Sequence, residues 1–356
     1  MTNEQWEKLL AVAVKGERLD TPLCGFIADS PWLPRWAGNA STLDYFSSDE
    51  VWLETNLAVV RTFPDAVFLP GFWSEYGMCT EPSAFGTRLI WHENELPFAE
   101  ALPGAGSGET ALALSKPDVR SAGLLPFTLR RLVHTRPAIE AAGHSLRFAV
   151  ARGPLNIASF LMGTTEFLMA MQLDPGGTHA MLEVITAFLE DWIQLQAATF
   201  PTIRGVMLLD DIIGFIGPED VAEFAMPSLK RVFGAIDGDI RFLHNDANGL
   251  SCAGQLAGAG VNLFNFSFEH PVDEMRALAG PAVTLLGNIP PRDVLAAGTP
   301  EQVRVCVAAQ KRALGNDFSR VIFSCGGGLP MGVTTENLSA FLEEAAGESK
   351  LPADGT

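Results

Sequence analysis

Residues 205–211 read Gly205-Val206-Met207-Leu208-Leu209-Asp210-Asp211, a short apolar run that ends in two carboxylates. A run without polar alternation is typical of a strand that is buried on both faces of a parallel sheet. In barrel enzymes the residues that follow such strands carry the chemistry, because they lie at the carboxyl end of the sheet. The stretch therefore predicts a buried parallel strand that presents carboxylates to a site.

Seven further runs of the same kind occur along the chain. They are Pro22–Ala28, Ala66–Pro70, Leu146–Ala151, Ile240–Leu243, Leu263–Phe266, Val283–Leu286 and Val321–Ser324. Helical patterns lie between them, such as His179–Ala197, whose apolar residues recur on one face. Strands that alternate with helices eight times predict an α/β fold, the (β/α)8 TIM barrel. A doubly wound open sheet is the alternative, but no Gly-x-Gly-x-x-Gly follows the first run, and the spacing in Gly104–Gly108 is wrong for that motif.

Two additions to the barrel are expected. Thr2 and Gln5 have the spacing of a capping box, which predicts a short N-terminal helix. The stretch from Trp73 to Ser145 is too long for one connection, so we expect an inserted hairpin near Arg88–Trp91 and a helix after the second strand. We interpret residues 1–346 as a single domain and the small, polar residues 347–356 as a flexible tail.

Composition limits the classes of partner. The chain has 42 Asp and Glu against 24 Lys and Arg, a net charge of −18, which repels nucleic acid and anionic membranes. Such a surface keeps a protein soluble or suits a basic partner. The five widely spaced cysteines do not form a disulfide framework and favour a reducing compartment. With neither a signal-peptide pattern nor an apolar run of bilayer length, we expect a cytoplasmic protein.

A histidine, a cysteine and several carboxylates follow the predicted strands. Because the carboxyl ends of all strands of a barrel lie at the same face, we expect these side chains to converge there. His244, Asp246 and Cys325 would supply the nitrogen, oxygen and sulfur ligands that Zn²⁺ accepts, with a fourth position left open. The alternatives are a hydrogen-bonded structural histidine with a cysteine packed as a small hydrophobe, another metal, or none.

The two carboxylates after residue 209 are candidate catalytic residues. Adjacent residues point to opposite sides of a strand, so one of Asp210 and Asp211 is expected to face the site and the other to cap a helix or form a pair. The one that faces the site could act as a general acid or orient a metal ligand.

A substrate pocket is expected beside the second strand. An aromatic group lies there, made up of Phe72, Trp73, Tyr76 and Phe85. It would be either the wall of a pocket for an apolar or aromatic substrate or the packing of the insertion. Glu75 follows the same strand and Asn288 follows the seventh, and we include both among the substrate-binding candidates.

Several segments together resemble the uroporphyrinogen-decarboxylase superfamily. They are Asp65-Ala66-Val67-Phe68, Glu75-Tyr76-Gly77-Met78, Arg152-Gly153-Pro154-Leu155, Asp210 in its strand, His244-x-Asp246, Gly287-Asn288-Ile289-Pro290-Pro291, Cys325-Gly326-Gly327-Gly328-Leu329-Pro330 and Thr334-Thr335-Glu336-Asn337-Leu338. The resemblance extends from about Thr21 to Phe341 and implies the same barrel fold.

One branch of this superfamily decarboxylates uroporphyrinogen without a cofactor. Its members resemble one another in an arginine-rich N-terminal loop and in an aspartate shortly after the second strand. Here the corresponding loop carries only Arg35, and the aspartate position falls near Phe72. A substrate with eight carboxylates requires cationic clamps, so the sequence argues against this reaction.

The other branch moves methyl groups to or from corrinoid proteins with a zinc motif that resembles His-x-Cys followed much later by Cys. His244 and Cys325 match this motif, whereas Asp246 stands where the family has cysteine. A carboxylate ligand would leave zinc more Lewis-acidic, which suits activation of a methyl ether or alcohol. The resemblance thus implies a zinc-dependent methyltransferase that acts with a corrinoid carried by a separate protein and with a small methyl donor or acceptor.

Two other functions stay open at this point. The first is a cofactor-free decarboxylase of the same fold that acts on a carboxylate other than uroporphyrinogen. The second is a non-catalytic binder of a corrinoid or tetrapyrrole. The sequence leaves open the substrate, the direction of methyl transfer and the formation of a homodimer.

Overall fold

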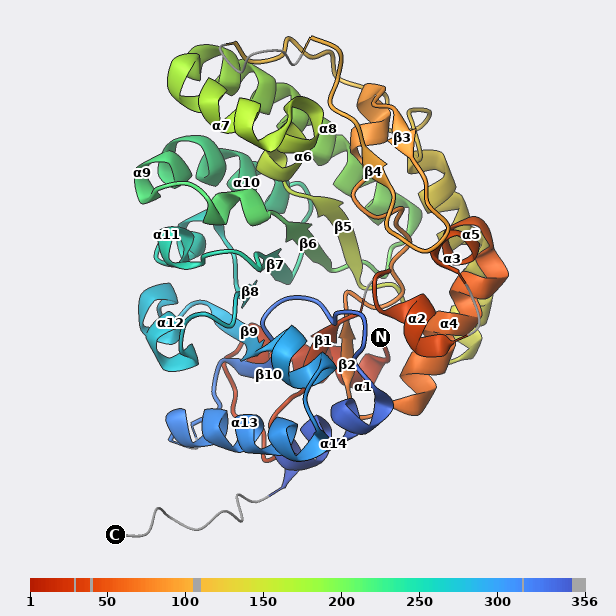
Figure 1. The fold of residues 1–356 in the computed structure, drawn as a ribbon, viewed down its shortest axis with the longest axis vertical. Coiled ribbons are helices and arrows are strands. Elements are labelled where there is room, and N and C mark those ends of the chain that lie inside the picture. The colour runs from red at the N-terminus through yellow and green to blue at the C-terminus, as the bar shows by residue number, and fades with distance from the viewer. Residues whose placement is uncertain (29, 39–40, 105–109, 316, 348–356) are drawn as a thin grey trace.

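The structure is a computed structural model that describes residues 1–28, 30–38, 41–104, 110–315 and 317–347. Eight parallel strands alternate with helices and form the predicted (β/α)8 barrel (Figure 1). The strands are β1 Gly25–Ile27, β2 Val67–Leu69, β5 Phe148–Arg152, β6 Gly205–Leu209, β7 Ile240–His244, β8 Leu263–Asn265, β9 Thr284–Ile289 and β10 Val321–Cys325. All eight lie at the predicted runs. The expected tail lies, apart from Gly347, outside the described residues.

Helices surround the strands in Figure 1. They are α1 Asn3–Ala13, α2 Leu33–Ala37, α3 Thr42–Ser47, α4 Asp49–Thr62, α5 Leu125–Ala141, α6 Pro154–Met162, α7 Thr164–Leu173, α8 Pro175–Thr199, α9 Pro218–Asp220, α10 Met226–Phe233, α11 Leu250–Ala253, α12 Val272–Ala279, α13 Pro300–Ala313 and α14 Thr335–Ala346. Short 3-10 or π-helical turns add Pro82–Phe85, Asp211–Gly214, Val221–Ala225, Leu256–Ala259 and Pro291–Ala296. Within the described ranges, no helix combines the length and the apolar character needed to cross a membrane.

Helix α1 closes the amino-terminal end of the barrel. The hydroxyl of Thr2 accepts a hydrogen bond from the backbone of Gln5, and the Gln5 side chain accepts one from the backbone of Thr2. This capping box was predicted, and it satisfies two amide groups that the first helical turn leaves free. Trp6, Leu9 and Val12 then pack against the inward-facing side chains of the strands. The carboxyl end of the barrel is therefore the end available for a site.

Alternation along the strands separates two hydrophobic layers. In β6, Met207 and Leu209 belong to the cluster inside the barrel, whereas Val206 and Leu208 belong to the cluster between strands and helices. This is the two-residue period of a strand, in which successive side chains point to opposite faces. Cys325 belongs to the outer cluster. The phase of each strand therefore determines which residues near its carboxyl end point into the mouth.

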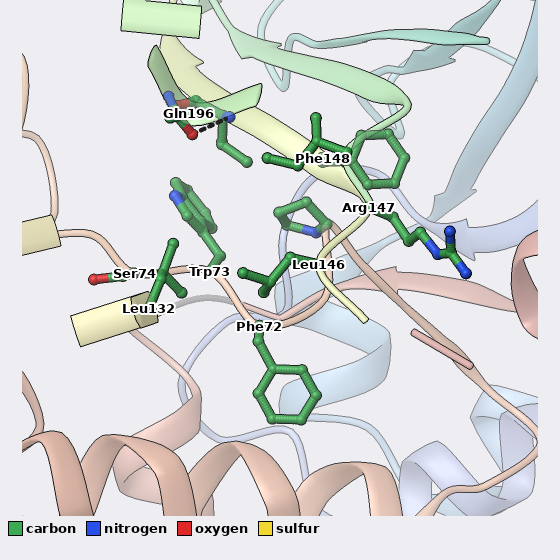
Figure 2. A pocket seen from close by; sticks show the side chains of 11 residues that line it. Phe72, Trp73, Ser74, Leu132, Leu146, Arg147, Phe148 and Gln196 are labelled. Atoms are coloured by element: carbon green, nitrogen blue, oxygen red, sulfur yellow. Dashed lines mark hydrogen bonds between the residues drawn. The ribbon is translucent and has the colours of Figure 1, made fainter. Parts of the chain in front are cut away.

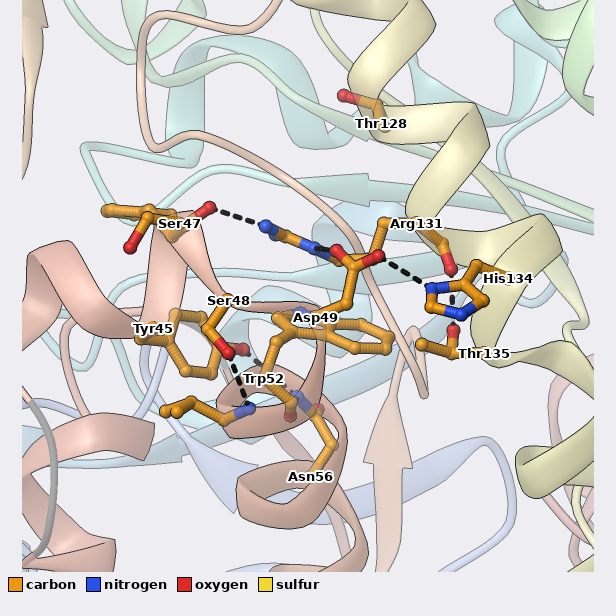
Figure 3. A network of polar contacts seen from close by, with 12 residues as sticks. Tyr45, Ser47, Ser48, Asp49, Trp52, Asn56, Thr128, Arg131, His134 and Thr135 are labelled. Atoms are coloured by element: carbon orange, nitrogen blue, oxygen red, sulfur yellow. Dashed lines mark hydrogen bonds and ion pairs between the residues drawn. The ribbon is translucent and has the colours of Figure 1, made fainter.

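The insertion after β2 contains the predicted hairpin and helix. Strands β3 Leu89–Ile90 and β4 Phe98–Ala99 pair in antiparallel fashion, and α5 follows. Arg131 of α5 is 2% exposed, and its Nε donates to Oδ1 of Asp49 in α4 at 2.9 Å (Figure 3). Its guanidinium also lies 5.2 Å from the ring centre of Tyr76 and 5.8 Å from that of Trp52. A buried, paired arginine thus anchors the insertion to the barrel.

The hydrogen-bonded wall of the barrel has one seam. Strands β5 to β10 form one sheet in chain order, and β1 pairs with β2. Bridges Cys24↔Phe323 and Ile27↔Gly328 join β1 to β10. Among the described residues, no backbone ladder connects β2 to β5.

A glutamine side chain occupies the middle of this seam. The Oε1 of Gln196, in α8, accepts a hydrogen bond from the Val150 backbone at 3.0 Å, and its Nε2 donates to the Val150 carbonyl at 3.0 Å (Figure 2). The backbone N–H and C=O groups of Val150 therefore both have hydrogen-bond partners, as they would beside a neighbouring strand. The seam also contains a cavity of about 10 Å³, lined in part by Trp73, Leu146 and Phe148 (Figure 2).

Gln196→Leu should lower the free energy of unfolding by about 3 kcal/mol, because two buried backbone groups of Val150 lose their partners. Gln194→Leu is the matched control, since Gln194 is exposed on the same helix and donates one bond to the Ala235 carbonyl. That change should cost less than about 1 kcal/mol. Urea unfolding measures the free energy of unfolding of both variants. Equal losses would contradict a stabilising role of the Gln196 hydrogen bonds in the seam.

Candidate metal centre

Three potential metal ligands converge at the mouth of the barrel. Asp211 begins the turn after β6, His244 is the last residue of β7, and Asp246 follows two residues later. One ligand atom from each of these residues lies within 4.8 Å of the others. His244 is buried, Asp211 is half-buried and Asp246 is exposed, so the group extends from the barrel interior to its opening.

Hydrogen bonds fix the relative positions of these groups. The Nδ1 atom of His244 lies 2.7 Å from Oδ1 of Asn265, and its Nε2 lies 3.8 Å from Oδ1 of Asp211. The backbone N–H of Asp246 donates to the same Asp211 oxygen at 3.1 Å. Asn265 therefore holds the imidazole at Nδ1, while Nε2 faces the carboxylate of Asp211.

The electrostatics of the group favour a bound cation. Partial burial and the neighbouring carboxylate of Asp211 raise the pKa of Asp246, while His244 and Arg292 act in the opposite direction. Two carboxylates held this close repel each other, and a divalent cation between them removes the repulsion. Imidazole and carboxylate ligands at about 2.0–2.2 Å suit Zn²⁺ in a three-ligand site with an open position. The side chains present thus fit a zinc-sized ion after a small contraction.

Cys325, the third predicted ligand, does not belong to this group. It lies in the outer layer, and its Sγ is 3.3 Å from the carbonyl oxygen of Gly327. Val321–Cys325 is buried at every position and apolar except for Ser324, so the run did not indicate that Cys325 lies in the outer layer. Zinc binding by Cys325 stays a prediction that this geometry does not favour. Asp211 takes its place in the candidate ligand set. Gly327, at φ +110°, brings the loop after β10 against Asp246, where a Cβ would lie 3.2 Å from the Asp246 Cβ.

Asp210, predicted as a catalytic candidate, caps helix α6. Its Oδ2 accepts from the Leu155 backbone at 2.9 Å, and its Oδ1 accepts from the Asn156 backbone at 3.0 Å. Burial, and then the charge of Asp211, raise the pKa of Asp210 to about 8. A Cβ on Gly153 would lie 2.3 Å from the Asp210 carboxylate, so this close approach requires glycine. The pair divides as alternation predicts, with Asp211 facing the site and Asp210 serving as a cap.

The predicted aromatic wall is largely packing of the insertion. Phe72 is 5% exposed and makes edge contacts with Trp52 and His144. Tyr76 is 7% exposed and packs against Phe46 and Trp91 as well as Arg131. Phe72 and Tyr76 thus take part in the packing of the insertion, and substrate binding by them stays a prediction. Figure 2 shows Trp73 pointing in the direction opposite to Phe72.

Glu75 forms a clamp between loops at the mouth. Its Oε2 accepts from Arg152 at 2.9 Å, and its Oε1 accepts from the Ser30 hydroxyl at 2.7 Å. Arg152 also lies 5.5 Å from the ring centre of Trp73. Because Arg152 ends β5 and Glu75 follows β2, the ion pair crosses the seam. Glu75 and Trp73 therefore act first as parts of this clamp.

Asn288, the last predicted substrate-binding residue, lies near the end of β9 and joins this strand to the loop after β8. Its Nδ2 donates to the carbonyls of Ser267 at 3.2 Å and His270 at 2.5 Å. Sequence reasoning missed Asn265 and Arg152 as site residues. Both end a strand in the inward phase, as His244 does, and that shared phase is the signal that could have identified them.

The sequence profile described as "Uroporphyrinogen decarboxylase (URO-D)" matches residues 7–347. The chain belongs to this family. Uroporphyrinogen decarboxylase from Photobacterium profundum is 23% identical over 333 residues, which cover 88% of each chain. Methylated-thiol–coenzyme M methyltransferase from Methanosarcina mazei is 24% identical over 284 residues, which cover 78% of this chain and 72% of that protein. The family membership is clear, and the named relatives include two different chemistries.

Solved structures share the barrel. A methyltransferase from Methanosarcina mazei superposes with a TM-score of 0.77 at 17% identity, covering 96% of this chain and 98% of that one. A B12-independent methionine synthase from Shewanella superposes with a TM-score of 0.56 at 9% identity, covering 91% and 97%. At these identities the likeness concerns the fold of this URO-D family member.

Glu81 provides a test of the clamp region by pH. Burial raises its pKa to about 7 from an ordinary 4.5, with Arg152 opposing and Glu75 adding to the shift. The folded state thus keeps a proton that the unfolded chain releases, so the free energy of unfolding should fall as pH rises from about 4.5 to about 7. The contribution of Glu81 to the slope should be at most about 1.4 kcal/mol per pH unit, and Glu81→Gln should remove that contribution while leaving the part that comes from Asp210. Denaturant unfolding across this pH range measures it, and parallel curves for the two proteins would contradict the assignment.

Proposed function

We propose that this URO-D family protein is a metal-dependent methyltransferase. It would move a methyl group between a small substrate and a corrinoid carried by a separate protein, with Zn²⁺ as its metal. The observation that carries the proposal is the convergence of Asp211, His244 and Asp246 at the mouth of the barrel. This position is where barrel enzymes carry their chemistry, and an exposed Asp246 leaves the centre open to ligands from outside.

The side chains divide the work as follows. His244 and the two carboxylates would hold the metal at the mouth of the barrel. The amino-terminal end of the barrel is closed by α1. A bound Zn²⁺ supplies Lewis acidity toward the heteroatom that carries or receives the methyl group. The hydrogen bond from the Asp246 backbone to Asp211 orients that carboxylate. The Glu75–Arg152 clamp holds the loops on the other side of the opening.

The ligand set favours an oxygen substrate. Its oxygen and nitrogen donors are harder than thiolates and leave the metal more electrophilic. A curated relative is named for methylated thiols and coenzyme M. For this chain we propose instead the methyl ether of a small alcohol or phenol, because it is the leaving oxygen that a more Lewis-acidic metal assists.

Decarboxylation is the competing function, because curated relatives carry that name. Two observations weigh against uroporphyrinogen as substrate. Arg35, the only arginine in the N-terminal loop, donates to the carbonyl of Asn94, and Arg152 is paired with Glu75. A polycarboxylate would thus meet neither of these arginines as a free partner, and it would also face Asp211 and Asp246.

Metal analysis after zinc-replete expression tests the proposed centre. The wild-type protein should carry stoichiometric zinc, whereas Asp211→Asn and His244→Gln should bind zinc at least about 10-fold more weakly because each loses a ligand. Cys325→Ser is the matched control, since its thiol lies outside the group, and it should retain zinc. A zinc-free wild-type protein, or loss of zinc only in Cys325→Ser, would contradict the centre.

A reaction assay then separates the functions. With reduced corrinoid and a methoxylated phenol, the zinc-loaded protein should form methylcorrinoid, detected by its absorption spectrum, and free phenol. Asp211→Asn should lower this rate by about 100-fold or more, as expected when a metal ligand is lost. Carbon dioxide release from an acid without metal would support the decarboxylase. Tight corrinoid binding without turnover of any substrate would support the non-catalytic binder.

A further inference from the structure

Asn265 lies directly behind the candidate metal centre. It is the last residue of β8, points into the barrel and has no exposed surface. Its Oδ1 lies 2.7 Å from Nδ1 of His244. Its Nδ2 donates to the Leu286 carbonyl at 2.7 Å and to the Cys325 carbonyl at 3.2 Å. One side chain thus connects β7, β9 and β10 inside the barrel.

These contacts determine how the Asn265 amide is oriented. Both neighbours of Nδ2 are carbonyl oxygens, which only accept hydrogen bonds, so an NH₂ group must face them. The opposite orientation would place the amide oxygen against two carbonyl oxygens in a buried site and leave the NH₂ group against His244. The Oδ1 atom is therefore the atom that faces the imidazole, and it can only accept.

The orientation of the Asn265 amide determines which ring nitrogen of His244 carries the proton. Because Oδ1 of Asn265 accepts, the Nδ1 atom of His244 must carry the proton and donate. In the neutral ring, Nε2 then has the free lone pair, and this is the nitrogen 3.8 Å from Asp211. We propose that Asn265 is a positioning residue that fixes His244 as the Nδ1–H tautomer and so keeps Nε2 available as a ligand.

The alternative tautomer shows why this matters. A proton on Nε2 would point toward Asp211 and form a histidine–carboxylate hydrogen bond, which would occupy both groups and block ligation. Free imidazole adopts either tautomer, so the choice has to come from the partner of the other nitrogen. Asn265 thus decides whether His244 serves as a metal ligand or as a partner of Asp211. Its effect on zinc rests on the proposed function, whereas the tautomer itself does not.

The experiment measures the tautomer in the metal-free protein. Long-range ¹⁵N–¹H correlation spectra of ¹⁵N-histidine-labelled protein, recorded above neutral pH, distinguish protonated from unprotonated ring nitrogens. His244→Gln identifies the His244 signals by their loss. Wild type should show a protonated Nδ1 and a bare Nε2. Asn265→Leu should lose this preference.

Asn262→Ala is the matched control. Asn262 also links neighbouring strands through two backbone contacts, accepting from Arg241 and donating to Asp239, but it lies before β8 and away from His244. It should lower stability without changing the His244 spectrum. Zinc affinity, measured by competition with a chromophoric chelator, should fall about 10- to 100-fold in Asn265→Leu and stay unchanged in Asn262→Ala.

The outcomes separate this inference from the proposed function. A wild-type spectrum with the proton on Nε2 overturns the inference, and this result needs no variant to fold. An Asn265→Leu protein that keeps the Nδ1–H tautomer overturns it as well. If the tautomer behaves as expected but the wild type binds no zinc, the positioning role stands and the proposed metal centre fails.

Discussion

The alternation of side chains along parallel strands in a filled barrel controls the rest of this structure. Inside the barrel every second residue packs against its neighbours, as Met207 and Leu209 do. Continued past the strand end, the same phase leads to Asp211. The phase of β7 leads from Phe242 through His244 to Asp246. The convergence of these groups follows from packing of the apolar interior, and no separate scaffold is needed to bring them together.

This constraint also explains what the sequence could and could not reveal. Continuous apolar runs and capping boxes are local signals, and they predicted the strands and the first helix. The phase of a strand buried on both faces leaves no local signal, because both of its faces are apolar. The interpretation therefore recognised that Asp210 and Asp211 face opposite ways but selected Cys325, which lies in the outer layer. Long-range contacts with α6 and β8 decide these positions.

The seam between β2 and β5 explains why several predicted substrate-binding residues make structural contacts. A barrel with an unpaired wall needs other groups to join its edges, and here Gln196 serves in the middle and the Glu75–Arg152 pair at the mouth. Phe72 and Tyr76 are occupied by packing of the insertion next to this seam. The sequence showed an aromatic cluster but not its partners, since Trp52, Arg131 and His144 are distant along the chain.

The exchange of ligands changes the softness of the proposed centre without changing its charge. The zinc motif of the methyltransferase branch that the sequence resembles combines one imidazole with two thiolates. The group in this structure combines one imidazole with the carboxylates of Asp211 and Asp246. Either set neutralises a divalent cation, so the charge of the proposed centre would be the same with both. Only the polarisability differs, and harder ligands favour substrates with oxygen at the reacting position. Cys325 still takes part in this arrangement, because its backbone carbonyl helps to orient the Asn265 amide that holds His244.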